Sequence, residues 1–476
     1  PLARSLAPLQ AEQSSVVLSS SSGSEGESPL PQRLPTSHLP AQVNLHEVLA
    51  NQEMLLDPRA VIAQWALSAD SSSLAAPLGK VANGVLHLDL RTDGPHALIA
   101  GTTGSGKSEL LRSLVASMAL HHSPKRLSFL LVDYKGGAAF RTLTLLPHTV
   151  GLITDLSPQL AKRALVSLRA ELHYREAQLA RLEISEITET PKNCSAEVPP
   201  ALIVVVDEFA TLARELPEFV DGLVDLSQRG RSLGMHLVLA TQRPAGVITD
   251  AIRANTGLRI ALRVADEDDS RDVVEIAEAA LLPREVPGRA ILRSGPGQCA
   301  AVQLAYSGSS GSPASRVHSR PLGDPPPRNS FATAVASPTE LDLAVSSAIS
   351  AAAAEQLGRP RPPWLEALPE HLKLSQVQSS GDALAIGWTD RPDQQRRELL
   401  EVNLSRDGGL LLLGASGSGR STALQAGAMA AITQFQGRVQ IYGIDAGTAL
   451  GALQAFSQVG AIISVEDSER VLRLLR

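Results

Sequence analysis

The chain has 476 residues, a formal net charge of −6 and a pI near 6.0. Its 43% hydrophobic content is ample for two or three packed domains, and the acidic balance argues against a broadly basic nucleic-acid coat, though not against a local basic channel. Two cysteines, Cys194 and Cys299, indicate neither a disulfide framework nor a zinc site, which fits a reducing cytoplasm. No apolar run approaches the ~20 residues of a membrane helix, and because the chain begins with Pro1, an anchor could precede it.

The N-terminal part changes composition near residue 40. Residues 1–40 are rich in Ser, Pro and Gly and are predicted to be disordered. Helical patterning follows over Val43 to Trp65, and Pro77 to Leu90 is typical of a hairpin with its turn at Asn83-Gly84. The first nucleotide domain is predicted to span residues 41–306.

A phosphate-binding loop follows the hairpin. His96 to Ala100 predicts an apolar strand, Glu109 to Leu120 predicts a helix, and the sequence between them, GTTGSGKS, fits G-x-x-x-x-G-K-[ST]. Such a loop aims its N–H groups at phosphate oxygens, while Lys107 would reach the β- and γ-phosphates and Ser108 would bind Mg²⁺. The alternative is a glycine-rich turn that binds nothing. The predicted nucleotide-binding residues are Gly101, Thr102, Thr103, Gly104, Ser105, Gly106, Lys107 and Ser108.

Two acids end the next strongly apolar run. Ala201 to Val206 predicts a parallel strand buried on both faces, and Asp207 and Glu208 follow it directly. Asp207 would hold the Mg²⁺ shell, and Glu208 could orient or deprotonate the attacking water. Alone, an Asp-Glu pair after a strand is usually a helix N-cap, so the catalytic interpretation depends on the loop at Gly101.

A further strand is predicted in the segment Met235 to Gly246. It ends in Thr241, Gln242, Arg243 and Pro244, a polar cluster that can contact a γ-phosphate and report hydrolysis. We therefore count Gln242 among the catalytic candidates. The alternative is an ordinary turn opened by Pro244.

The second half of the chain repeats the first pattern. Residues 307–360 are predicted to form a Pro-rich linker that ends in an Ala-rich helix near Leu341 to Leu357, and residues 361–476 a second domain. There Gly408 to Leu424 predicts a strand, a glycine loop and a helix. Arg420 replaces the lysine, and its planar fork does not reproduce a compact ammonium between phosphates, so this site is expected to bind nucleotide weakly without efficient hydrolysis. Its candidate nucleotide-binding residues are Gly414, Gly419, Arg420 and Ser421.

Asp445 corresponds to Asp133 of the first copy. The sequence reaches Arg476 before any counterpart of the strand that ends in Asp207 and Glu208, so we expect the second domain to be incomplete.

Five sequence blocks, in order, resemble the FtsK/SpoIIIE group of ring-forming ATPases. They are GTTGSGKSELLRSL, LLVDYKGGAAF, LLPHTVGLITDL, LIVVVDEFATL and GRSLGMHLVLATQRP. The resemblance covers about Pro77 to Tyr306 closely and Asp382 onwards more loosely. DYKGGAAF and two motor modules on one chain resemble the EccC-type ATPases of type VII secretion, whereas DNA-pumping members usually carry one module.

The resemblance implies RecA-like P-loop ATPase domains of the α/β class, in tandem around central parallel sheets and assembled as a hexameric or similar ring. In such rings an arginine from a neighbour often completes the site. Arg163 and Arg231 are candidates, although Arg163 could lie on a solvated helix face and Arg231 could bind a carboxylate or a helix C-terminus. Asp133, Lys135 and His148 match the blocks without a definite role.

The sequence and the family resemblance leave three candidate functions. The first is an ATP- and Mg²⁺-dependent motor that exports secreted proteins, placed at the cytoplasmic face of the membrane with secretion or division machinery. The second is a double-stranded DNA translocase with a basic lumen, to which Arg253, Arg259 and Arg263 could contribute if they do not simply flank a strand. The third is a non-motor ATP-dependent scaffold, against which Lys107, Asp207 and Glu208 count.

Overall fold

The structure is a computed structural model, which describes residues 38–133, 136, 139–154, 158–190, 198–310, 337–365, 368–377, 379, 381 and 383–476. Most of the segment predicted to be disordered lies outside this range, as do Lys135, Cys194 and residues 311–336 of the predicted linker.

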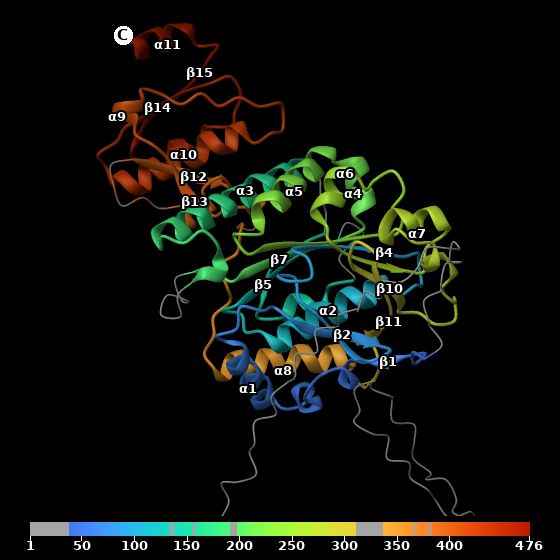
Figure 1. The fold of residues 1–476 in the computed structure, drawn as a ribbon. Coiled ribbons are helices and arrows are strands. Elements are labelled where there is room, and N and C mark those ends of the chain that lie inside the picture. Colours follow the sequence, from blue (N-terminus) through green and yellow to red (C-terminus); the bar gives the residue numbers. More distant parts are fainter. Residues whose placement is uncertain are drawn as a thin grey trace, which may run out of the picture.

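The first module is built on one large sheet (Figure 1), which has eleven strands within the described residues. Its middle is parallel, as predicted, and helices cover both faces. The strands at its centre are buried along their whole length, which explains their unbroken apolar sequences. The parallel strands lie in the order β9 (Leu258–Leu262), β4 (His96–Ala100), β8 (Met235–Thr241), β7 (Ala201–Asp207), β5 (Leu127–Asp133) and β6 (Thr149–Ile153).

Antiparallel strands extend the sheet beyond β9. They are β10 (Arg289–Gly295), β11 (Gln298–Tyr306), β2 (Ala76–Val81) and β3 (Gly84–Leu88), with β1 (Val43–Asn44) parallel to β11. The predicted hairpin is confirmed as β2 and β3.

The helical prediction for residues 43–65 is correct only in its second half. The helix α1 (Pro58–Ser68) begins where the Asp57 side chain accepts a hydrogen bond from the Arg59 amide and proline occupies the first turn. Before it come β1 and two short 3₁₀ turns, η1 (Leu45–Glu47) and η2 (Gln52–Leu55).

Helices on the two faces of the sheet enclose two separate cores. One face carries α1, α2 (Lys107–His121) and α8 (Glu340–Ala354). The other carries α3 (Pro158–Arg181), α4 (Phe209–Glu215), α5 (Pro217–Gly230), α6 (Asp250–Asn255) and α7 (Glu267–Val274). Short 3₁₀ turns connect further elements: η3 (Thr142–Leu145), η4 (Ile187–Glu189), η6 (Glu278–Leu281), η7 (Leu374–Gln376) and η8 (Gly451–Ala455).

The Ala-rich helix α8 packs on the first module. Its alanines bury one face against α1 and α2, with Ala348 and Ala351 fully covered. Thr339 caps its start by accepting a hydrogen bond from the Asp342 amide. The sequence assigned this helix to the linker, and we propose that the first module extends through it.

The second module consists of smaller units in the described residues. Two two-stranded sheets, β12 (Leu384–Arg391) with β13 (Arg396–Val402) and β14 (Ile441–Asp445) with β15 (Val459–Ser464), accompany α9 (Leu404–Asp407), α10 (Arg420–Phe435) and α11 (Ser468–Leu475). The strand predicted near residues 408–413 is wrong: this stretch is irregular, with Leu411 and Leu413 exposed. In the first module the equivalent strand β4 is held between β8 and β9, whereas no strand in the described part of the second module pairs with residues 408–413.

Candidate nucleotide site at the carboxyl ends of the strands

The phosphate loop lies between β4 and α2, where the sequence predicted it. Gly104 and Gly106 adopt φ angles of 79° and 101°, which L side chains rarely tolerate. A Cβ on Gly101 would come within 2.5 Å of the Ser105 hydroxyl oxygen. The glycines therefore allow the tight bend that ends at Lys107, the first residue of α2.

Main-chain hydrogen bonds fix this loop to the neighbouring strands. The Thr102 amide and hydroxyl both donate to the Arg263 carbonyl at the end of β9, at 2.9 and 3.0 Å. The Gly288 amide, just before β10, donates to the Ser105 carbonyl at 2.8 Å. These anchors cannot be predicted from the sequence, because main-chain carbonyl and amide groups occur at nearly every residue and leave no pattern.

Lys107 and Asp207 form a buried ion pair beneath the loop. Their exposed fractions are 4% and 8%, and the lysine ammonium donates to Asp207 Oδ1. The same oxygen accepts a hydrogen bond from the Glu208 amide at 2.9 Å. The structure thus brings together the charged groups of the two sequence motifs, which lie 100 residues apart.

Glu208 has an unusual backbone conformation. Its φ and ψ of 60° and 48° lie in the left-handed region, which is strained for a residue with a Cβ. Glu208 occupies the N-cap position of α4, yet its side chain makes no capping hydrogen bond. The simple alternative, in which this acid serves to cap a helix, is therefore not what the structure shows.

Gln242 reaches the loop from the end of β8. The Gly101 amide donates to the Thr241 carbonyl at 3.1 Å, which sets β8 beside the loop. The Thr103 hydroxyl then donates to Gln242 Oε1 at 3.0 Å. The alternative turn is also present at Pro244. The side-chain amide of Gln242 nevertheless contacts the phosphate loop.

The ligand set fits Mg²⁺. Ser108 lies in the first turn of α2 beside Lys107, and the Asp207 carboxylate lies beneath the loop. Hydroxyl and carboxylate oxygens are the hard donors that this ion prefers, with water and phosphate oxygens completing the shell. The side chains that would hold it are therefore Ser108 and Asp207.

Two other residues from the matched blocks have structural roles. Asp133 ends β5, and its carboxylate accepts a hydrogen bond from the Ala139 amide at 3.2 Å. Asp445 repeats this at the end of β14, where it accepts hydrogen bonds from the amides of Gly447 and Leu450. His148 is fully buried, and burial lowers its pKa to about 4, so it is a neutral core residue.

The second glycine loop keeps the shape of the first. Gly417 and Gly419 have φ angles of 78° and 88°, close to those of Gly104 and Gly106. Arg420 begins α10 as Lys107 begins α2, but it is exposed and has no carboxylate partner among the described residues. The loop geometry is retained without the buried ion pair.

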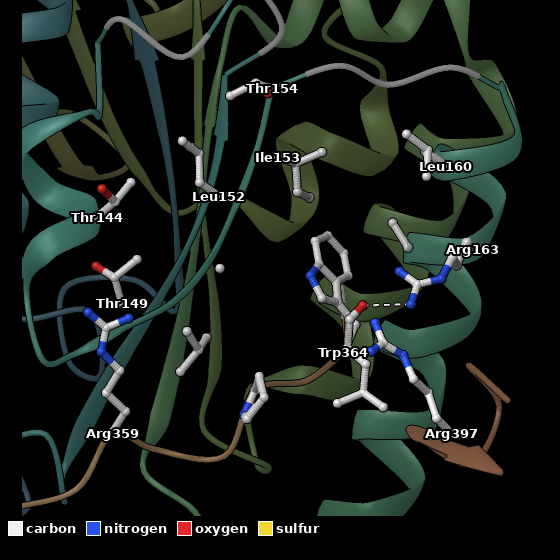
Figure 2. A pocket seen from close by; sticks show the side chains of 15 residues that line it. Thr144, Thr149, Leu152, Ile153, Thr154, Leu160, Arg163, Arg359, Trp364 and Arg397 are labelled. Carbon is white, nitrogen blue, oxygen red and sulfur yellow. Dashed lines mark hydrogen bonds between the residues drawn. The ribbon is translucent and has the colours of Figure 1, made fainter. Parts of the chain in front are cut away.

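Arg163 bonds within its own chain. Its guanidinium pairs with Asp390 on β12. It also donates to the Leu365 carbonyl at 2.6 Å, the hydrogen bond drawn as a dashed line in Figure 2. It lines a cavity of about 680 Å³ between edge strand β6, α3 and the segment that contains Trp364. This cavity lies away from the phosphate loop. The only sign of it in the local sequence is Trp364, which stands in a proline-rich segment.

Arg231 follows α5 and precedes β8, so it lies near the amino-terminal ends of the parallel strands, whereas the phosphate loop follows the carboxyl end of β4. Neither candidate arginine contributes to the site of its own module. A role of Arg231 across a ring interface stays a prediction. Arg163 could take such a role only after its ion pair with Asp390 is broken.

Comparisons with known proteins show the family of the chain. Residues 59–246 and 377–476 match the profile of the FtsK/SpoIIIE family. The chain belongs to the FtsK/SpoIIIE family. It is 33% identical over 470 residues, 93% of its length, to the ESX secretion system protein EccC of Geobacillus thermodenitrificans, of which it spans 31%. It is 32% identical over 403 residues, 78% of its length, to the type VII secretion system protein EssC of Staphylococcus aureus, of which it spans 27%.

A solved structure shows the same architecture. The cytoplasmic domain of the type VII secretion ATPase EccC of Thermomonospora curvata superposes with a TM-score of 0.75 at 29% identity, covering 90% of this chain and 50% of that one. The expected fold of tandem P-loop ATPase modules is confirmed. The chain spans about a third of the length of the curated relatives it matches. Within its described residues, no helix has the length and apolarity required to cross a membrane.

Proposed function

We propose that the first module of this FtsK/SpoIIIE family member hydrolyses ATP at the loop Gly101–Ser108. Lys107 binds the β- and γ-phosphates, and Glu208 orients or deprotonates the attacking water. Ser108 and Asp207 would hold Mg²⁺, which would neutralise charge on the phosphates. The observation that supports this most is the convergence of Lys107, Asp207 and Glu208 at one buried point beneath the loop.

We further propose that the complete protein uses this hydrolysis to export proteins in a type VII-like secretion system. The support is the match of both modules, over 90% of the chain, to a type VII secretion ATPase. Assembly as a ring, a hexamer by family resemblance, and a place at the cytoplasmic face of the membrane belong to the same proposal. The second module, with its exposed Arg420, would bind substrate or regulate the first.

Translocation of double-stranded DNA is the less favoured alternative. It needs free cations in the ring lumen, and two of the arginines that could have supplied them are engaged in ion pairs. Arg253 pairs with Asp272, and the buried Arg259 pairs with Glu275. These guanidinium groups are therefore already paired with carboxylates, and the whole chain has a formal net charge of −6.

One paired assay tests the proposal. ATP turnover of the complete protein is measured alone, with linear duplex DNA and with secreted helical-hairpin proteins from the same genome. We expect stimulation by a protein substrate and none by DNA. Strong, salt-sensitive stimulation by DNA alone would overturn the export proposal, since phosphate contacts weaken as salt rises.

A further inference from the structure

Two neighbouring threonines of the phosphate loop have different partners. The Thr102 hydroxyl donates to the Arg263 carbonyl and so fixes the loop to the sheet. The Thr103 hydroxyl instead donates to the side-chain oxygen of Gln242, a residue 139 positions later in the chain. Thr103 therefore joins the loop to the side chain that follows β8.

This hydrogen bond determines what the Gln242 amide offers to a ligand. A primary amide has an accepting oxygen and a nitrogen with two N–H donors. Since Thr103 occupies the oxygen, the nitrogen is the end that remains for another partner. Within the described part of the chain, Gln242 Nε2 donates to no protein acceptor.

The second glycine loop shows the same distinction. The position of Thr102 is taken by Ala415, whereas the position of Thr103 is taken by Ser416, which keeps a hydroxyl. Of these two positions, the one that contacts the strand-end glutamine in the first module keeps its hydroxyl and the other does not.

We propose that Thr103 is a positioning residue for hydrolysis: its hydroxyl holds Gln242 so that the amide N–H groups face the γ-phosphate or the attacking water. The inference rests on the proposed ATP hydrolysis at this loop. With the amide reversed or free to rotate, a carbonyl oxygen would meet the phosphate and repel it. The Thr103 side chain acts only through Gln242. The nucleotide contact predicted for Thr103 uses its main-chain N–H group, which a change of side chain leaves in place.

The test compares steady-state ATP turnover and ATP affinity in variants of the complete protein. Thr103→Val should lower kcat about 3- to 10-fold, the value of one neutral hydrogen bond, and leave the Kd for ATP unchanged. Thr103→Ser should restore kcat, because it keeps the hydroxyl. Thr188→Val, an exposed threonine bonded to Glu186 far from the loop, is the matched control and should behave as wild type.

A double variant separates positioning from a local structural effect. Gln242→Ala lowers kcat by itself, and adding Thr103→Val should then cause no further loss. An unchanged kcat in Thr103→Val, or independent losses in the double variant, would overturn the inference. Absence of ATP turnover in the wild-type protein would instead refute the proposed hydrolysis, and the inference with it.

Discussion

At the scale of single residues, the strained backbone of Glu208 allows its contribution to catalysis to be tested separately from its effect on the free energy of unfolding. A non-glycine residue at φ 60° costs on the order of 1–3 kcal/mol, which the surrounding strand and helix impose. Asparagine tolerates this conformation better than glutamate or glutamine. The strain therefore offers a test of why a glutamate stands there.

Glu208→Asn should abolish ATP turnover and raise the free energy of unfolding by about 0.5–1 kcal/mol, measured by urea denaturation. Glu208→Gln keeps the strain and the size, so it should lose turnover without gaining stability, while nucleotide still binds. Residual turnover in Glu208→Gln would show that another group activates the water.

Arg420 is the second residue whose identity can be tested directly. The loop around it has the conformation of the first loop, so a lysine should fit between phosphates where the guanidinium does not. Arg420→Lys should tighten nucleotide binding to the second module, about 10-fold if one charged contact of about 1.4 kcal/mol is gained. The measurement is titration in a Lys107→Ala background, which weakens binding at the first loop. An unchanged affinity would mean that the second loop is inactive for a reason other than its arginine.

At the scale of secondary-structure elements, α8 tests where the first module ends. Ala348 is completely buried against α1 and α2, and Ala353 on the same helix is exposed. Ala348→Leu should lower the free energy of unfolding by about 1–3 kcal/mol through overpacking, and Ala353→Leu should leave it unchanged. Thermal unfolding of both variants measures this. Equal stability of the two would show that α8 is not part of the core.

The sequence predicted those elements whose signal is local. β4, β7 and β8 were predicted because burial on both faces leaves an unbroken apolar run, and α2 because a glycine loop precedes it. The apolar run near Leu411 gives the same signal but forms no strand, since a strand also needs hydrogen-bonded neighbours from elsewhere in the chain. Composition could not show that α8 packs on the first module, because alanine suits a linker helix and a tight helix interface equally.

In the candidate site, too, the features that depend on local sequence could be predicted and those that depend on distant contacts could not. Lys107, Asp207 and Glu208 were predicted because their chemistry depends on side-chain type and spacing. The anchors of the loop at Arg263 and Gly288 act through main-chain groups, and the pairing of Arg163 with Asp390 depends on how the modules meet. Neither of these depends on a local motif, so only the structure could show them.

At the scale of the whole molecule, buried histidines make the first module acid-sensitive. Burial lowers the pKa values of five of them, to about 4 for His96, His121, His148 and His236 and to about 3 for His122. In the unfolded chain their pKa is about 6.5, so between pH 6.5 and 4 only the unfolded chain takes up these protons. The free energy of unfolding should therefore fall across this range, by up to about 3 kcal/mol for a single histidine.

Urea denaturation at pH 8, 6.5, 5 and 4 measures this loss. His148→Gln retains a donor for the His122 carbonyl but cannot be protonated, so it should make the fall less steep. A stability that stays constant or rises as the pH drops from 6.5 would contradict the assignment of these histidines as neutral.

The pair of Lys107 with Asp207 has a consequence for how the site is filled. When Lys107 turns to a phosphate, it abandons a carboxylate that is 8% exposed, and a buried charge without a counter-charge costs several kcal/mol. A second cation must therefore neutralise the Asp207 carboxylate when Lys107 moves to the phosphate. Binding of nucleotide and binding of the divalent ion are therefore coupled. ATP should bind far more weakly in the presence of a chelator than with Mg²⁺, because the ion pair of the empty site would otherwise be broken without replacement.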